Sequence, residues 1–479
     1  MSTDNPKTIL LDALRQRDLR FFSQILTRER VMCAAVACGR AIGHNPLNLF
    51  NLSWLAIASA WHTSKSFGDV LLLFFRLYND IQVGESYPPA DHPTPHQPDP
   101  LAIITEEAFT LARDNVPALF WNFLLAILID DFERLYPDLV CHKRFRVLAL
   151  DGTCLSMQNR KTLIKHFGTA SNGRGRKVPR ARMVCLLLPF TRMIAGYELG
   201  SYTDSEHTLG RHLLERTLRK DDLVLMDKGF WSYGLFWQIQ NKGAFFATRL
   251  KARIGMTKIK DLGLDDELVT HSPKDWRKSW RKKGLKKEIT LRVIRYQLPG
   301  FQASAIVTNV LDPREISREE WIRLVEVDRT GRVIVAAGLY HRRWEIETSY
   351  REIKCDQGLE GGLRSRKPKG IRYEVAGHLL LYVLIRWKIV EAAKAAGIED
   401  PLRVSFTATL NILEGMMWAA WIQEEEVVDK VLLPRLLMRM VEHLVSVRPN
   451  RHYPRLRDDK PKKKKKKKPK AVPTENTTQ

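Results

Sequence analysis

The alternation of strand-like and helix-like segments between residues 145 and 250 constrains the fold more than any other feature of the chain. Short apolar runs typical of buried strands alternate with segments in which apolar residues recur every three or four positions. Ser205 and Glu206 form a typical helix start. The predicted order is β-β-β-α-β-α-β, at 145–151, 182–188, 193–199, 205–218, 222–227, 233–241 and 244–250. This order predicts an α/β domain.

Two of the predicted strands end in an aspartate. Asp151 follows the apolar run VLAL, and Asp227 follows the run LVLM. A lone aspartate at such a position is most often a turn residue. Two strand-end aspartates together with a third carboxylate would instead form an all-oxygen site of the kind that Mg²⁺ or Mn²⁺ prefers.

A candidate for the third carboxylate lies in the segment YHRRWEIETSYREIK, residues 340–354. Tyr340, Arg343, Glu347 and Lys354 fall within an arc of about 60° on an α-helix. One carboxylate and two cations on such a narrow stripe make a poor core face. We expect Glu347 to bind metal, and Arg343 and Lys354 to bind a phosphate backbone. The alternative for Tyr340 is packing through its ring.

The neighbours of this stripe have simpler predicted roles. Glu352 is expected on a solvated face of the helix, and Trp344, about 40° beyond the stripe, is expected in the core.

Three carboxylates that hold metal ions are sufficient for phosphodiester chemistry. Two ions can clamp the attacking and leaving oxygens of an in-line phosphoryl transfer. Such a reaction needs no nucleophilic serine or cysteine. Asp151, Asp227 and Glu347 are therefore the predicted catalytic residues and metal ligands.

The motifs D-G-T at 151–153, D-K-G-F at 227–230 and Y-x2-R-x3-E-x6-K at 340–354 resemble those of the Insertion Sequence 4 family of DDE transposases. The resemblance covers roughly residues 144–369. It implies a ribonuclease H-like core with a β-rich insertion, Mg²⁺ as cofactor, and contacts of Tyr340, Arg343 and Lys354 with the cleaved DNA end. Hairpin-forming relatives carry a tryptophan in the insertion where this chain has Ser304 or Ala305, so a hairpin step is a family expectation only.

The composition indicates a polyanionic partner. The net charge is +24, and nine lysines near the C-terminus leave about +15 for the rest of the chain. Trp276 and Trp280 lie among seven Lys or Arg residues, a mixture suited to stacking and phosphate contacts on DNA. The alternative is a solvated basic loop with one anchoring tryptophan. Further basic residues follow Asp151 and are expected along the DNA path: Arg160, Lys161, Lys165, Arg174, Arg176, Lys177, Arg180 and Arg182.

The spacing of the cysteines and the length of the apolar runs indicate in which cellular compartment the protein is found. The six cysteines form no metal-binding pair, and no apolar run is long enough to span a membrane. We expect a cytoplasmic, nucleoid-associated bacterial protein with reduced thiols.

Composition shifts suggest a division of the chain. The predicted parts are a helical DNA-binding region at 1–86, a proline-rich linker at 87–101, a helical lead-in at 102–143, a first core part at 144–250, a β-rich insertion at 251–311, a second core part at 312–370, a helical region at 371–450 and a basic tail at 451–479.

The sequence thus predicts a Mg²⁺-dependent cut-and-paste transposase that acts as at least a homodimer on the inverted repeats of its element and on target DNA. Two alternatives remain open. One is a metal-dependent nuclease on the same fold that performs no strand transfer. The other is a catalytically inert DNA-binding descendant.

Overall fold

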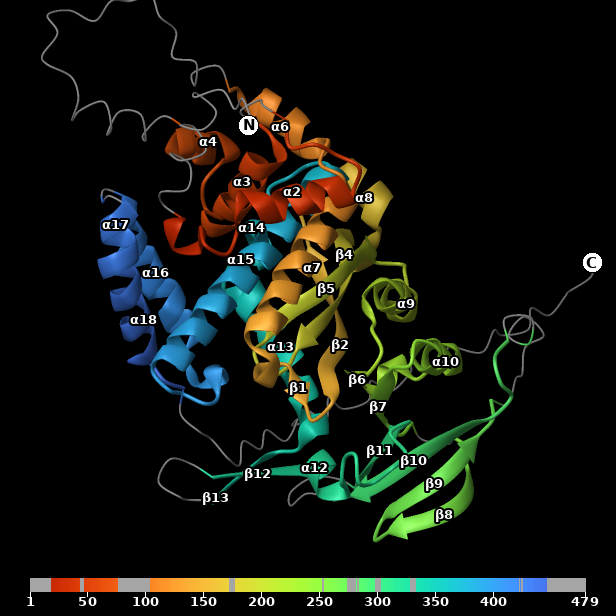
Figure 1. The fold of residues 1–479 in the computed structure, drawn as a ribbon. Coiled ribbons are helices and arrows are strands. Elements are labelled where there is room, and N and C mark those ends of the chain that lie inside the picture. Colours follow the sequence, from red (N-terminus) through yellow and green to blue (C-terminus); the bar gives the residue numbers. More distant parts are fainter. Residues whose placement is uncertain are drawn as a thin grey trace, which may run out of the picture.

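The computed structural model describes residues 19–43, 47–75, 104–171, 177–251, 254–273, 281, 284–297, 303–327, 333–421, 423 and 425–445. It is a mixed α/β structure, as predicted, built on one large sheet (Figure 1). The predicted linker at 87–101, the tail at 451–479, Trp276, Trp280, Arg174 and Arg176 lie outside the described residues.

The sheet has eleven strands. Its central order is β5-β4-β2-β6-β7-β11-β10-β9-β8. The five strands expected at 145–250 are β2 (Phe145–Ser156), β4 (Lys177–Leu188), β5 (Met193–Ser201), β6 (Asp222–Met226) and β7 (Phe245–Arg249). β2, β4 and β5 form an antiparallel meander, whereas β6 and β7 run parallel to β2. Short strands β1 (Cys141–His142) and β3 (Thr169–Ser171) pair with β2 and β4.

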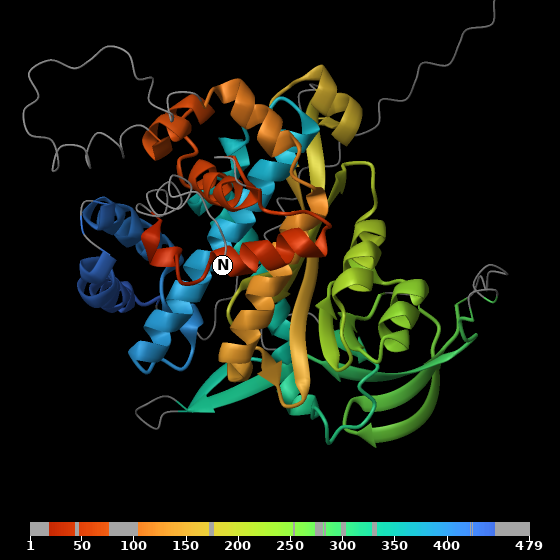
Figure 2. The ribbon, with the colours of Figure 1, turned by 45° about the horizontal axis from the view of Figure 1, so that its top comes forward.

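Helices cover both faces of the five central strands (Figures 1 and 2). On one face lie α9 (Glu206–Thr217) and α10 (Tyr233–Asn241). On the other lie α7 (Ala118–Leu135), α13 (Glu345–Arg351) and the long α15 (Pro368–Ala395). Alternate side chains of β2 point to opposite faces of the sheet. Leu150 and Gly152 lie close to α9. Asp151, between them, therefore points to the other face, toward α13.

Four more strands extend the sheet beyond β7, because β11 pairs antiparallel with β7. They fall in the range for which the sequence predicts a β-rich insertion: β8 (Thr257–Gly263), β9 (Asp266–His271), β10 (Ile289–Tyr296) and β11 (Ser304–Thr308). After β11 the chain passes α12 (Arg318–Ile322) and the hairpin of β12 (Arg323–Val327) and β13 (Val333–Ala337), and then reaches α13.

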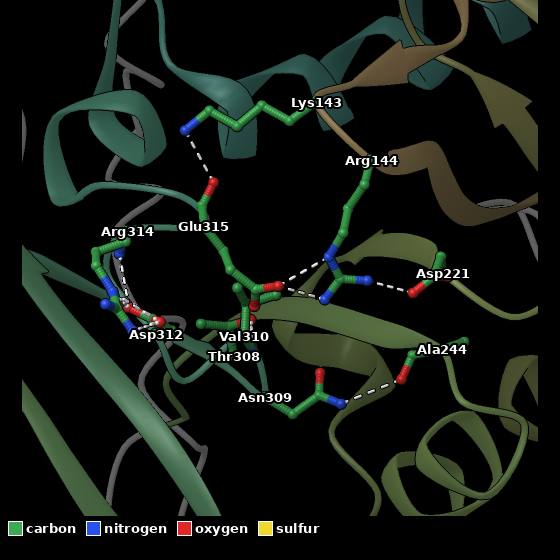
Figure 3. Close-up of polar contacts among 10 residues, drawn as sticks. All are labelled: Lys143, Arg144, Asp221, Ala244, Thr308, Asn309, Val310, Asp312, Arg314 and Glu315. Atoms are coloured by element: carbon green, nitrogen blue, oxygen red, sulfur yellow. Dashed lines mark hydrogen bonds and ion pairs between the residues drawn. The ribbon is translucent and has the colours of Figure 1, made fainter.

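The junction after β11 is held by polar contacts (Figure 3). The Asn309 amide accepts from the backbone N–H of Phe246 at 2.7 Å and donates to the carbonyl of Ala244 at 3.2 Å, so it continues the pairing with β7. Arg144, in the turn before β2, pairs with Glu315 and Asp221. The connection toward α13 is thereby fixed to the central sheet.

Further helices precede the sheet or follow α13, and several of them pack against α15. Those before the sheet are η1 (Arg20–Phe22), α2 (Arg28–Ala37), α3 (Leu49–Trp61), α4 (Phe67–Phe75), α6 (Glu106–Asp114) and η2 (Pro137–Leu139). Those after α13 are α14 (Leu359–Gly362), η6 (Pro401–Arg403), α16 (Phe406–Trp421), α17 (Glu425–Val427), η7 (Val428–Leu432) and α18 (Leu433–Val441). Within the described ranges no single helix could cross a membrane; α6 and α7 together reach that length and apolarity but meet at a bend of 77°.

Candidate active site at the junction of strands β2 and β6

The two predicted aspartates are brought together by the register of two parallel strands. Leu150 of β2 pairs with Met226 of β6, so the next residues, Asp151 and Asp227, are neighbours across the sheet. β6 ends there, and Asp227 caps the 3₁₀ turn η3 (Lys228–Phe230) by accepting from the Gly229 N–H. β2 continues to Ser156, so the expectation that Asp151 ends its strand is wrong. It lies at the point where β2 loses its parallel neighbour.

The predicted Tyr340–Lys354 helix is one continuous segment of three helical types. A 3₁₀ turn, η4 (Leu339–Trp344), leads into α13, which widens into a π-helical stretch, η5 (Glu352–Asp356). Ideal α-helical spacing therefore does not apply across it. Three of its polar side chains nevertheless reach the strands with the aspartates: Tyr340 contacts Met226, Arg343 approaches Asp151, and Lys354 contacts Cys154.

Arg343 lies between two of the predicted catalytic carboxylates. Its guanidinium is 3.2 Å from the Glu347 carboxylate and 3.8 Å from that of Asp151, and its Nε has no hydrogen-bond partner. Burial lowers the pKa of Arg343, but Tyr340, Asp151, Glu347 and Asp227 more than offset this, so its pKa is raised. One buried cation thus pairs with Asp151 and Glu347, and Asp227 acts on it only through space.

The pKa of Asp151 is raised by its surroundings. Burial raises its pKa to about 6, the Glu347 and Glu206 carboxylates add to this, and the Gly152 N–H and Arg343 oppose it. Crowded carboxylates short of positive charge are what a cation site requires before it binds its ion.

Two tyrosines fix the segment against the backbone of both aspartate strands. The Tyr340 hydroxyl donates to the carbonyl of Met226 at 2.9 Å, and the Tyr350 hydroxyl donates to that of Asp151 at 2.7 Å. Tyr340 is only 1% exposed, which fits the packing alternative for this residue. Lys354 donates to the Cys154 carbonyl at 3.0 Å and pairs with Glu360 at 3.0 Å.

Two neighbours of the stripe differ from expectation. Glu352 was expected in solvent but is 2% exposed, because its carboxylate binds arginines from two other elements. Trp344 was expected in the core but is 47% exposed, near the guanidinium of Arg343. The 3₁₀ turn shifts Trp344 away from the position that α-helical spacing gives it.

The acidic residues fit a hard divalent cation in ligand type. Asp151, Asp227 and Glu347 offer only carboxylate oxygens, which Mg²⁺ and Mn²⁺ prefer, and Arg343 supplies the compensating charge among them. Across the part of the chain that the structure describes, no three His, Cys, Asp or Glu side chains lie close enough together to hold an ion as they stand. Glu347 has 40% of its side chain exposed, compared with 21% for Asp151.

Residues 142–384 match the profile of the transposase DDE domain family. The chain belongs to this family. The transposase InsG for insertion sequence element IS4 of Escherichia coli (strain K12) is 30% identical over 244 residues, which are 50% of this chain and 51% of that protein. The chain thus spans about half the length of the curated relative that it matches. The cryo-EM structure of the piggyBac transposase synaptic complex with hairpin DNA is similar at a TM-score of 0.34 and 10% identity, over 92% of this chain and 86% of that chain.

The transposase DDE domain contains a further carboxylate that sequence reasoning missed. Glu206, at the start of α9, fills the space beside Gly152, where a Cβ atom would lie 2.8 Å from its carboxyl carbon. Any larger residue at 152 would displace Glu206 from the neighbourhood of Asp151. The D-G-T motif itself contains the signal, because a glycine directly after a strand aspartate marks a close approach.

Proposed function

We propose that this chain is a metal-dependent transposase that cuts DNA at the ends of its own element and joins the freed 3′-hydroxyl to target DNA. The observation that carries the proposal is that Asp151 and Asp227 are neighbours where β6 ends beside β2, while buried Arg343 joins Asp151 to Glu347 through ionic contacts. The order β5-β4-β2-β6-β7, with three antiparallel strands followed by two parallel ones, supports a ribonuclease H-like core.

In this proposal the three carboxylates hold the metal, and the positive charge of Arg343 partly offsets their negative charge. Mg²⁺, or Mn²⁺ in its place, would activate water and stabilise charge on the phosphate oxygens when bound. Asp151 binds a metal ion in its ionised form. Because its pKa is raised to about 6, this form predominates only above about pH 6. Arg343 holds the Asp151 and Glu347 carboxylates near each other before the ion arrives and is then available to a phosphate oxygen through its planar fork.

We propose that DNA lies along the cations next to this site. Lys354 lies beside the strand that carries Asp151 and acts as a point charge on the phosphate nearest the cleaved bond. Exposed cations from two distant segments continue the track, joined by a hydrogen bond of 2.7 Å from the Thr162 hydroxyl to the Arg366 carbonyl. They are Arg160, Lys161, Lys165, Arg366, Lys367 and Lys369. Trp276 and Trp280 are proposed to stack on DNA bases.

The proposal extends to the organisation of the protein. Residues 144–250 and 312–370 are taken as the two parts of the catalytic core, interrupted by the insertion at 251–311. Paired cleavage of two inverted repeats implies at least a homodimer. We propose a bacterial, cytoplasmic protein associated with the nucleoid.

The test is cleavage of DNA that carries the terminal repeat, with Asp151→Asn, Asp227→Asn and Glu347→Gln beside the wild type. Each variant keeps the size of its side chain and removes the charge. We expect Mg²⁺-dependent cleavage to be lost in all three while DNA binding persists, since binding rests on cations elsewhere. Glu319→Gln, at a carboxylate that is 74% exposed on α12, is the matched control.

A variant that still cuts at the wild-type rate would remove that residue from the site. Joining of a pre-cleaved end to target DNA separates the proposal from a nuclease without strand transfer. Wild-type protein that binds DNA but never cuts it, with any divalent metal, would identify an inert descendant instead.

A further inference from the structure

The side of the Leu339–Asp356 segment that faces away from Glu347 carries a second set of charges. Glu345 and Glu352 are seven residues, or about two turns, apart and emerge on the same side. Glu347, two residues after Glu345, emerges on nearly the opposite side. Neither Glu345 nor Glu352 belongs to the motif that carried the family resemblance.

Arg192 bridges these two glutamates. Its guanidinium lies 2.6 Å from the Glu345 carboxylate and 2.8 Å from that of Glu352. Arg192 lies in the turn between β4 and β5 and has a φ of 59°, a left-handed conformation that residues other than glycine seldom adopt. The turn therefore accepts backbone strain at the residue whose side chain reaches both glutamates.

Glu352 is also held from the opposite direction by α15. Its carboxylate pairs with Arg386 and accepts a hydrogen bond from the Tyr382 hydroxyl at 2.7 Å. Arg386 is fully buried and Glu352 is 2% exposed. Two cations and two carboxylates balance each other, as a buried ionic cluster must.

This arrangement controls how the segment is rotated about its own axis. A carboxylate about 6 Å from a helix axis moves by about 1 Å when the helix turns by about 10°. A misplacement of about 1 Å at a reacting centre can reduce the rate about a hundredfold. An attachment away from the axis opposes that rotation, and a second one two turns along also prevents the segment from tilting.

We propose that Arg192, Glu345, Glu352 and Arg386 form a clamp of positioning residues that sets the orientation of Glu347 toward Asp151 and Asp227. This proposal rests on the proposed function, because it concerns the metal ligands of the same site. None of the four clamp residues needs to touch metal or DNA. Outer contacts that orient metal ligands commonly change metal affinity by about 10- to 100-fold when removed.

The test is the affinity of the DNA-free protein for Mn²⁺, measured by calorimetry, with thermal unfolding recorded for every variant. Arg192→Gln is expected to weaken Mn²⁺ binding at least about tenfold. Arg192→Lys, which reaches one carboxylate as a point charge but lacks the fork, should recover only part of the loss. Arg219→Gln is the matched control, since Arg219 also bridges two carboxylates, those of Asp130 and Glu133, far from the site.

A double-mutant cycle distinguishes positioning from general stability. If the clamp acts through Glu347, Arg192→Gln should have no further effect on Mn²⁺ affinity once Glu347→Gln is present. Should Arg192→Gln fail to fold, Glu345→Gln, which removes one charge from a side chain with 21% exposure, takes its place in the cycle.

Two other results would overturn the clamp, and they are distinguishable. Unchanged Mn²⁺ affinity in folded Arg192→Gln or Glu345→Gln, or additive effects in the cycle, would leave the arginine a purely structural role while the metal site stands. Unchanged affinity in Glu347→Gln would instead remove Glu347 from the metal site, and the proposed function would fail with the clamp.

Discussion

The two sides of the Leu339–Asp356 segment both carry arginines and glutamates, but the ionic contacts are loose on one side and tight on the other. On the side of Glu347, the ionic contacts of Arg343 are long, at 3.2 and 3.8 Å, and its Nε is unpaired. On the other side, Arg192 makes contacts of 2.6 and 2.8 Å, and Glu352 is enclosed by two arginines and a tyrosine. Short ion pairs among buried groups specify a structure, whereas longer contacts at a partly exposed carboxylate leave charge available to a ligand, although Nη1 of Arg386 is also without a hydrogen-bond partner.

The largest expected difference is in catalysis. Glu347→Gln should reduce single-turnover cleavage about a thousandfold, equivalent to about 4 kcal/mol of transition-state stabilisation. The midpoint of chemical denaturation should hardly change, because 40% of the Glu347 side chain is in solvent. A large loss of stability in this variant would show that the side with Glu347 also stabilises the fold, and would contradict the contrast between the two sides.

The next effect is on folding. Glu352→Gln leaves Arg192 and Arg386 without their shared charge, so we expect the free energy of unfolding to fall by about 3 kcal/mol. Glu319→Gln on the exposed face of α12 should change it by less than about 0.5 kcal/mol. Urea titration followed by tryptophan fluorescence compares them, and equal midpoints would contradict the assignment of Glu352 to a tight ionic cluster.

A substitution just before the segment should affect both stability and Mn²⁺ binding. Gly338 lies just before the segment, and a Cβ there would be 2.2 Å from the backbone carbon of Ile322. Gly338→Ala should therefore destabilise the protein by about 2 kcal/mol and also weaken Mn²⁺ binding. Gly234→Ala, with nothing within 4 Å of the added atom, is the control. Loss of stability without loss of Mn²⁺ affinity would show that the start of the segment can move independently of Glu347.

The smallest effect is the pH dependence of stability. Burial raises the pKa of Glu352, but Arg386 and Arg192 outweigh it, so its pKa in the folded state is lowered. Its contribution to stability is thus present above the unfolded pKa of about 4.3 and is lost as the pH falls through the folded value. Wild type should lose stability more steeply than Glu352→Gln below about pH 4.3. Parallel acid titration curves would argue against a charged Glu352.

Local sequence patterns predicted the elements whose partners are close in the chain or repeat regularly. The apolar runs before Asp151 and Asp227 identified both strands. The spacing of Arg343 and Glu347 placed both on one stripe, but their direct contact was not predicted. The mixed α/β class followed from the order of these patterns.

What could not be predicted depends on distant partners. Glu352 is buried because of Arg192, 160 residues earlier, and Arg386, 34 residues later. Nothing in the segment itself distinguishes it from a solvated glutamate. Trp344 is exposed because η4 is a 3₁₀ turn, which ideal α-helical spacing does not anticipate. The roles of the predicted site residues in catalysis and DNA binding remain predictions.

The hydroxyls of Tyr340 and Tyr350 reach main-chain carbonyls, not acidic side chains. These two attachments use main-chain atoms, which every amino acid has, so they do not depend on the acidic side chains. We expect a gene copy that has lost one of these carboxylates by mutation to encode a folded protein with its cationic surface intact. Under the proposed function, such a copy would compete with active molecules for the same DNA.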